Sequence, residues 1–298
     1  MRCILPVFFI LTLLSMVSSV GAEDWNVRDH IPLEKIMVQC HRGAGALSPE
    51  NSIEAFELAW QWDTIPELDL RTTKDGVIVA FHDNNFKRIL PDASEDFQKK
   101  QIGDLTLAEV QKLDIGIWKG KEFEGQRIPT LAETLKAMVG KAERMIYIDI
   151  KNVDFEQLAR ETEGFHPQLI LASTNYQEIR LWKKLAPTSL TLHWMGGSEE
   201  TLEKRFVELR KTDFADIDQL QIHVRIDKDG KFSPSEEFLK NVGIELRKHD
   251  VTFQTLPWEC RDATVFKRLM DLGCASFATD YPDTTMTAIR EYYRGYKK

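Results

Sequence analysis

Short apolar segments alternate with segments of helical period along almost the whole chain, and this alternation restricts the fold more than any other feature. Strands separated by helices form a parallel sheet covered by helices, either closed into a barrel or doubly wound. The predicted strands are residues 36–40, 65–70, 77–81, 145–150, 169–172, 189–194, 220–225, 251–255 and 275–279. The predicted helices are residues 52–60, 131–139, 154–163, 176–185, 199–212, 233–248 and 263–272. No Gly-x-Gly-x-x-Gly follows the first strand, which disfavours a dinucleotide-binding fold.

The nine predicted strands are one more than an eight-stranded barrel holds. Strands 65–70 and 77–81 are separated by fewer residues than a parallel crossover needs, and Asp75-Gly76 between them is a strong hairpin signal. We therefore predict an α/β fold, a (β/α)8 TIM barrel with a β-hairpin after its second strand. A two-residue turn at Asp75-Gly76 would place Asp69 opposite His82. Residues 84–128 contain no clear strand, and we predict a long connection or a small insertion there.

The first 22 residues have the layout of a secretory signal peptide. Arg2 precedes an almost unbroken apolar run, and Val20-Gly21-Ala22 supplies small residues for cleavage. The run is short for a membrane span, although a retained N-terminal anchor is the alternative. No other stretch of the sequence reaches the roughly 20 apolar residues of a spanning helix. We expect cleavage near Ala22, a secreted or periplasmic location, one mature domain over residues 23–298 and no stable membrane insertion.

The net charge limits the partners that the chain can bind, and the cysteine content limits its disulfide bonds. The net charge of −8 becomes −9 without residues 1–22, because these contain one arginine and no acid. Such an acidic chain gains little from counterion release on a polyanion, so we predict no nucleic-acid partner. A small anionic substrate held by a local positive cluster is compatible with this charge. The odd number and wide spacing of Cys40, Cys260 and Cys274 argue against a disulfide framework, and buried free thiols are expected at Cys40 and Cys274.

Polar residues stand at the ends of several predicted strands, where the catalytic groups of such barrels project. These ends are His41-Arg42-Gly43, Glu67-Leu68-Asp69, His82-Asp83 in the hairpin, and Asp149-Ile150-Lys151. Because strand side chains alternate between faces, Glu67 and Asp69 point the same way, as do Asp149 and Lys151. A surface salt-bridge ladder is the alternative for any single pair. Two such pairs beside histidine and arginine favour one shared site.

The residue types at these ends suit phosphodiester chemistry. Three converging carboxylates would repel one another unless a cation lay between them, and oxygen ligands favour Ca²⁺ or Mg²⁺ over zinc. Arg42 and Lys151 add positive charge that suits an anionic substrate such as a phosphodiester. His41 and His82 titrate near neutral pH, as an acid and a base for ester cleavage require.

The order and spacing of these segments resemble the glycerophosphodiester phosphodiesterase family over almost the whole mature chain. The similar segments are His41-Arg42-Gly43, Pro49-Glu50-Asn51-Ser52, Glu67-x-Asp69, Asp75-Gly76, His82-Asp83, Ile128-Pro129-Thr130-Leu131, Asp149-Ile150-Lys151 and Thr279-Asp280-Tyr281-Pro282-Asp283. The resemblance implies a divalent metal site with the ligands Glu67, Asp69 and Asp149. It also implies that His41 and His82 are the acid–base pair and that Arg42 and Lys151 contact the phosphate. Glu50 and Asn51 would support the loop that holds Arg42, and Asn51 or Ser52 also suits a helix N-cap.

Three segments depart from the family's usual pattern. Asp149 stands where glutamate is usual, Ile89-Leu90-Pro91 replaces small polar residues, and residues 254–258 replace a Trp-Thr-x-Asn-like stretch. These changes leave the predicted reaction centre intact and bear on the leaving group. Outside the predicted site, we interpret His193 and His223 as core or rim histidines. Trp194 and Trp258 suit either a pocket or core packing.

The predicted function is hydrolysis of a glycerophosphodiester, or a similar small phosphodiester, to an alcohol and a phosphomonoester such as glycerol 3-phosphate. One alternative is a lipid phosphodiesterase of the phosphoinositide-specific phospholipase C type. The other is a secreted binding protein without catalysis on the same barrel, against which the paired histidines argue, because binding alone needs no proton donors. The sequence leaves open which histidine is the acid and whether a substrate hydroxyl attacks first to give a cyclic intermediate.

Overall fold

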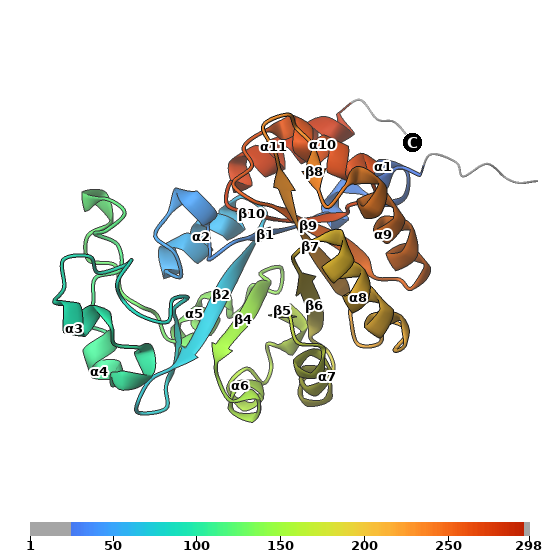
Figure 1. The fold of residues 1–298 in the computed structure, drawn as a ribbon. Coiled ribbons are helices and arrows are strands. Elements are labelled where there is room, and N and C mark those ends of the chain that lie inside the picture. Colours follow the sequence, from blue (N-terminus) through green and yellow to red (C-terminus); the bar gives the residue numbers. More distant parts are fainter. Residues whose placement is uncertain (1–24, 295–298) are drawn as a thin grey trace, which may run out of the picture.

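The structure, a computed structural model, describes residues 25–294. The predicted signal segment, with its cleavage position at Ala22, lies outside the described residues. Eight parallel strands close into a barrel surrounded by helices, because β1 pairs with both β2 and β10 (Figure 1). The barrel strands are β1 (Met37–Cys40), β2 (Ile65–Thr72), β4 (Ile146–Asn152), β5 (Leu169–Ser173), β6 (Leu190–Met195), β7 (Gln219–Ile226), β9 (Thr252–Pro257) and β10 (Ser276–Thr279). The predicted (β/α)8 barrel is confirmed.

Helices follow the strands on the outside of the barrel. The longer ones are α2 (Ile53–Gln61), α5 (Leu131–Met138), α6 (Phe155–Glu161), α7 (Tyr176–Leu185), α8 (Glu199–Arg210), α9 (Glu236–Lys248), α10 (Ala263–Asp271) and α11 (Pro282–Tyr293). Shorter helical segments are α1 (Val27–His30), η1 (Leu33–Lys35), η2 (Gly45–Leu47) and η5 (His166–Gln168). The sequence does not predict α11, because its buried face includes polar Thr285, whose hydroxyl donates to the Tyr281 carbonyl at 3.0 Å.

Side-chain caps define where the main helices begin. Ser52, Ser198 and Ser235 each accept a hydrogen bond from the third residue of the following helix. The predicted helix over residues 233–248 therefore begins later, at Glu236. The residues before it form β8 (Phe232–Ser233), which pairs antiparallel with the end of β7.

The predicted hairpin is present, formed by β2 and β3 (Ile78–Ala80), but its register differs from the prediction by one residue. The Phe81 amide donates to the Asp69 carbonyl at 2.8 Å, so Asp69 lies opposite Phe81 and not opposite His82. The turn contains three residues instead of two, because the Thr73 amide donates to the Val77 carbonyl at 2.9 Å. Gly76 makes this wider turn accessible, since its φ of +85° is favourable only for glycine.

Residues 84–128 form a compact segment beside the hairpin, on the left of Figure 1. It contains α3 (Glu95–Gln98), η3 (Ile102–Asp104), α4 (Leu107–Val110) and η4 (Lys121–Phe123). Its buried side chains form their own apolar cluster with the hairpin, made of Val79, Phe81, Phe86, Ile89, Ile102, Leu105, Val110, Ile115 and Ile128. We call residues 84–128 the insertion.

The barrel interior carries a polar layer beneath its mouth. Tyr147 donates its hydroxyl hydrogen bond to Gln219 at 2.7 Å, and Gln254 donates to the Ser276 hydroxyl at 2.8 Å. Each of these side chains is buried, so hydrogen bonds must satisfy its polar atoms. Gln219 and Ser276 are the first residues of β7 and β10, so this layer lies toward the start of the strands and leaves their carboxyl ends for a site.

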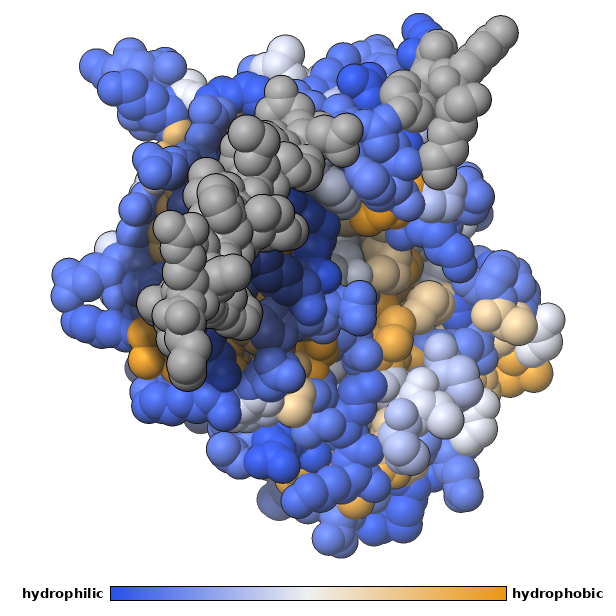
Figure 2. Space-filling view, turned by 90° about the vertical axis from the view of Figure 1, so that its right-hand side faces the viewer, coloured by the Kyte–Doolittle hydropathy of each residue, from blue (hydrophilic) through white to orange (hydrophobic). Residues whose placement is uncertain are grey.

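The described cysteines lie in the core, and the surface shown in Figure 2 is mostly hydrophilic. Cys40, Cys260 and Cys274 are free and buried, as expected for Cys40 and Cys274. Hydrophilic side chains cover most of the face in Figure 2, with hydrophobic ones in small scattered groups. Among the helices of residues 25–294, none is both long and apolar enough to cross a bilayer.

Candidate active site at the carboxyl ends of the strands

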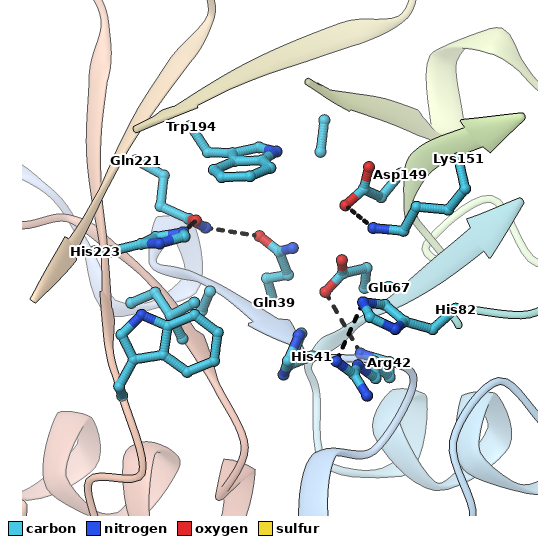
Figure 3. Close-up of a pocket in the computed structure, with 14 residues that line it drawn as sticks. Gln39, His41, Arg42, Glu67, His82, Asp149, Lys151, Trp194, Gln221 and His223 are labelled. Atoms are coloured by element: carbon cyan, nitrogen blue, oxygen red, sulfur yellow. Dashed lines mark hydrogen bonds and ion pairs between the residues drawn. The ribbon is translucent and has the colours of Figure 1, made fainter. Parts of the chain in front are cut away.

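A cavity opens at the carboxyl ends of the barrel strands, and six of the predicted site residues line it (Figure 3). These six are His41, Arg42, Glu67, His82, Asp149 and Lys151. The other lining residues are Gln39, Ala172, Trp194, Gln221, His223, Leu256, Trp258 and Ala278. The fold therefore brings segments from both ends of the sequence to a single rim, as the strand-end pattern predicts.

Three carboxylates converge at the base of this rim. Glu67, Asp69 and Asp149 each offer an oxygen, and these oxygens lie within 4.8 Å of one another. Asp69 and Asp149 are register partners on β2 and β4. Asp69 is 0% exposed, and the ammonium of Lys151 is the cation that faces its Oδ1, at 3.1 Å. A buried carboxylate inside an all-oxygen cluster, with one ammonium for three carboxylates, fits a hard divalent cation.

The pKa values of these carboxyls reflect their burial and the charges around them. Burial, together with the charges of Glu67 and Asp69, raises the pKa of Asp149 to about 7, although Lys151 opposes this shift. Burial also raises the pKa of Glu67. For Asp69, burial favours the neutral form, but Lys151 and other partners outweigh it and lower its pKa. The ammonium of Lys151 lies 2.9 Å from Asp149 Oδ2 and 3.1 Å from Asp69 Oδ1. One lysine between three carboxylates leaves the cluster short of positive charge.

Asn51 and Glu50 position the residues around this cluster. Asn51 donates to Asp69 Oδ2 at 2.8 Å and accepts from the Asp69 amide at 2.9 Å. It adopts a φ of +53° in doing so, and the adjoining Ser52 caps α2 instead. Glu50 accepts a hydrogen bond from Arg42 at 3.2 Å. Both side chains thus contact a predicted site residue directly.

Each predicted catalytic histidine is paired with an aspartate. His41 Nδ1 lies 2.7 Å from Asp280 Oδ1, and His82 Nδ1 lies 2.7 Å from Asp83 Oδ1. An ionised carboxylate only accepts hydrogen bonds, so Nδ1 is the protonated nitrogen in both rings. Their Nε2 atoms are therefore the ones available for proton transfer.

The two histidines differ in what surrounds them. Arg42 donates from Nη2 to His82 Nε2 at 3.1 Å, and since a guanidinium cannot accept, His82 is a neutral ring with a lone pair on Nε2. For His41, burial favours the neutral ring, but the Asp280 hydrogen bond and the charge of Glu67 outweigh it and raise its pKa. His41 is thus the ring biased toward the protonated form.

The loops after β1 and β10 fit together closely and hold His41 beside Asp280. The Ala46 amide donates to the Asp280 carbonyl at 2.7 Å, and the His41 amide donates to the Thr279 carbonyl at 3.0 Å. Gly45 makes this approach possible, because a Cβ there would lie 2.2 Å from the Asp280 carbonyl oxygen.

The insertion reaches the rim through two basic side chains. Arg88 donates to Asp83 Oδ2 at 2.8 Å and to Glu50 Oε1 at 2.6 Å, and its guanidinium lies over the Trp118 ring at 5.4 Å. Lys119 donates from Nζ to the Gly45 carbonyl at 3.3 Å. The insertion therefore braces both the hairpin end and the loop after β1.

Several site residues have no role assigned from the sequence. Asp83 and Asp280 lie within the segments that carry the family resemblance, which was the signal available for them. Trp194, His223 and Trp258 also line the cavity. Trp194 ends the predicted strand 189–194, whereas His223 lies inside the predicted strand 220–225 and Trp258 lies beyond the predicted strand 251–255. His193 does not line the cavity and is 3% exposed, as expected for a core histidine.

The closed (β/α)8 barrel and the residues on its rim define the class of the protein. It is a TIM-barrel hydrolase that acts on phosphodiester bonds. Residues 41–284 match the Glycerophosphoryl diester phosphodiesterase family. The chain belongs to that family, as the resemblance in its sequence segments indicates.

Individual relatives agree with this assignment. A glycerophosphodiester phosphodiesterase of Caldanaerobacter subterraneus subsp. tengcongensis is 30% identical over 272 residues, which covers 86% of this chain and 99% of the relative. Two solved structures share the fold. The glycerophosphodiester phosphodiesterase from Agrobacterium tumefaciens has a TM-score of 0.64 at 21% identity, with 84% of this chain and 99% of that one covered. A phosphodiesterase of Oleispira antarctica in complex with its product sn-glycerol-3-phosphate has a TM-score of 0.63 at 24% identity, with 85% and 96% covered.

Proposed function

We propose that this protein uses Ca²⁺ or Mg²⁺ to hydrolyse glycerophosphodiesters, or similar small phosphodiesters, to an alcohol and a phosphomonoester. The expected phosphomonoester is glycerol 3-phosphate, the product bound in the Oleispira structure. The observation that carries the proposal is the convergence of three carboxylates, two basic side chains and two histidine–aspartate pairs on one rim.

Glu67, Asp69 and Asp149 are the proposed metal ligands. When bound there, a divalent cation polarises the non-bridging oxygens of the phosphate. Lys151 is proposed to contact the phosphate as well, since its ammonium already lies at the edge of the carboxylate cluster. Arg42 is the second proposed phosphate contact, because its guanidinium lines the cavity. These cations offset the negative charge that develops on the phosphoryl oxygens.

The proposed roles of the two histidines follow from their hydrogen bonds. His82 acts as the base, because its Nε2 already accepts a hydrogen bond and can take a proton from the attacking water, or from a substrate hydroxyl whose cyclic product water then opens to the phosphomonoester. Arg42 must release this nitrogen when a phosphate enters. His41 acts as the acid and gives its Nε2 proton to the leaving alkoxide as the P–O bond breaks. Asp83 and Asp280 hold the two rings in the required tautomers.

Glu50 and Asn51 are proposed to support this arrangement without taking part in proton transfer. Glu50 holds the guanidinium of Arg42 at 3.2 Å, and Asn51 holds Asp69 at its carboxylate and at its backbone amide. Both lie in the loop between β1 and α2, so this loop links the phosphate contact to the metal ligand.

The direct test is incubation of purified protein with glycerophosphocholine and related diesters, with products identified by mass spectrometry. Turnover should be lost on chelation, return with Ca²⁺ or Mg²⁺, and be absent in His41→Ala. His249→Ala is a matched control, since that histidine pairs with Asp213 away from the cavity. Saturable binding without product would instead support the binding protein. A cyclic phosphate released from phosphoinositide vesicles would support the phospholipase C type.

We also propose export, with removal of residues 1–22. The basis is the charged, apolar and small-residue succession in this segment. Expression in an export-competent host should yield a protein outside the cytoplasm with an N-terminus near Glu23. An intact N-terminus in the membrane fraction would favour the retained anchor.

A further inference from the structure

The lining of the cavity is divided into two sides (Figure 3). The charged residues described above lie on one side, at the ends of β1, β2, β3 and β4. Trp194, His223 and Trp258 lie on the other side, at the ends of β6, β7 and β9, and we call these three residues the aromatic wall. Gln39 lies between the two sides, and Gln221 extends toward it from the side of His223.

The aromatic wall is a continuous packed surface that ends at the proposed acid. The Trp194 and His223 rings are stacked, with centroids 5.1 Å apart and 9° between their planes. Trp258 meets His223 edge to face at 5.3 Å and His41 at 5.7 Å. Since His41 is proposed to protonate the leaving oxygen, the body of the leaving alcohol would lie along this wall.

A chain of amides fixes which nitrogen of His223 carries its proton. Gln221 donates from its amide nitrogen to Gln39 Oε1 at 3.3 Å and also to Gln254 Oε1. Gln39 in turn donates to Glu67. The carbonyl oxygen of Gln221 is thereby left to face His223 Nε2, 3.1 Å away. That oxygen can only accept, so Nε2–H is the donor and Nδ1 holds a lone pair in the neutral ring.

The Nδ1 atom of His223 is free to accept a hydrogen bond from a ligand. Among the side chains and backbone of the described chain, it has no hydrogen-bond partner. Gly196 lies beside it without covering it, because a Cβ on Gly196 would come within 3.0 Å of Nδ1. Burial and the charges of His41, Arg225 and Arg205 lower the pKa of His223 to about 4, so the ring stays neutral at physiological pH.

His223 Nδ1 also distinguishes between head groups. A choline ester carries no N–H or O–H donor for this nitrogen, so it would leave the acceptor unpaired in the complex. An uncharged polyol can pack its C–H groups on the indole faces and donate a hydroxyl to Nδ1.

We propose that the aromatic wall is the subsite for the leaving alcohol and that it prefers an uncharged polyol, whose hydroxyl donates a hydrogen bond to His223 Nδ1. This inference rests on the proposed hydrolysis of glycerophosphodiesters. His223 is then a specificity-determining residue, not a proton-transfer residue.

The test compares glycerophosphoglycerol and glycerophosphoinositol with glycerophosphocholine, which share the glycerophosphate part. The wild-type protein should show a kcat/KM about tenfold higher for the two polyol diesters. His223→Phe keeps an aromatic ring but loses the acceptor, so it should lower kcat/KM for the polyol diesters about tenfold and leave glycerophosphocholine within about twofold. His249→Phe is the matched control and should change neither.

A second variant covers the case in which His223→Phe does not fold. Gly196→Ala places a methyl group 3.0 Å from Nδ1, where it blocks a ligand hydroxyl without removing the acceptor, so it should reduce the same two activities selectively. An equal or higher wild-type kcat/KM for glycerophosphocholine would overturn the subsite while leaving the proposed function standing. An equal loss for all three diesters in both variants would also overturn the subsite and leave the proposed function standing. Absence of turnover with every diester would overturn both proposals.

Discussion

The two sides of the cavity are built in different ways. On the charged side, short contacts to ionised partners orient each group, as in the 2.7 Å pairs of His41 with Asp280 and His82 with Asp83. On the aromatic wall, ring packing and neutral amides orient the side chains, and no formal charge is contributed by Trp194, His223 or Trp258. The comparison suggests a division of work in which the charged side holds and cleaves the phosphate and the wall selects the alcohol.

The largest effect is expected for Asp69→Asn on the charged side. The substitution removes the most buried of the three carboxylates, so we expect weaker Ca²⁺ or Mg²⁺ binding and an activity loss of about 10³-fold or more. Calorimetric titration of the metal and a thermal unfolding curve check the result. Asp63→Asn, an exposed carboxylate near Arg290, is the control. Unchanged metal affinity in Asp69→Asn would remove Asp69 from the ligand set.

The second-largest effect is expected for His82→Gln, in which kcat should fall about 10²- to 10⁴-fold. Glutamine can still contact Arg42 but cannot take up a proton, so the protein should still bind the diester. Steady-state kinetics and calorimetric binding of the diester separate the two effects. If binding is lost and kcat is kept, His82 belongs to substrate binding and not to proton transfer.

Asp280→Asn should have a smaller effect and a characteristic pH dependence. The Asp280 hydrogen bond and charge raise the pKa of His41, so their removal lowers it. The protonated acid is then lost at a lower pH, and the alkaline limb of the kcat/KM profile should move to lower pH. We expect roughly a tenfold loss at neutral pH. An alkaline limb that does not move would show that another group limits the rate there.

Arg88→Met tests how far the charged side depends on the insertion. Without the guanidinium, Asp83 and Glu50 lose a shared partner and His82 is held less firmly, so kcat should fall about tenfold. Arg127→Met, in the same insertion but bonded to the Leu113 carbonyl, is the control. Equal activity of the two variants would show that the insertion is not needed for orientation.

The smallest effect is expected on the aromatic wall. Trp194→Phe keeps an aromatic face but reduces its area, so KM should rise about two- to threefold with kcat unchanged. Steady-state kinetics with two head groups check this prediction. A fall in kcat as large as that of a charged-side variant would contradict the division between the two sides.

Much of the fold could be predicted because alternating apolar and amphipathic segments dictate a parallel barrel. The hairpin was recognisable at Asp75-Gly76, but its register depends on whether Lys74 also belongs to the turn, and that is fixed by the hydrogen bond from the Thr73 amide to the Val77 carbonyl. Helix α11 was missed because a threonine occupies its buried face.

The two sides of the cavity also differ in how well sequence predicts them. Charged residues are rarely buried without a reason, so Glu67, Asp69, Asp149 and Lys151 stand out at strand ends. The pairing of His41 with Asp280 spans 239 residues and exists only after barrel closure. Trp194 and His223 have no such signal, because aromatic side chains fill the cores of most barrels.

The attachment of the insertion at Arg88 and Lys119 has a consequence for inactivation. The insertion has its own apolar cluster, separate from the core around the barrel. Local opening of the insertion would release Asp83, Glu50 and the backbone at Gly45 while the eight-stranded barrel stays intact. On heating, turnover should therefore cease before circular dichroism records the collapse of the barrel.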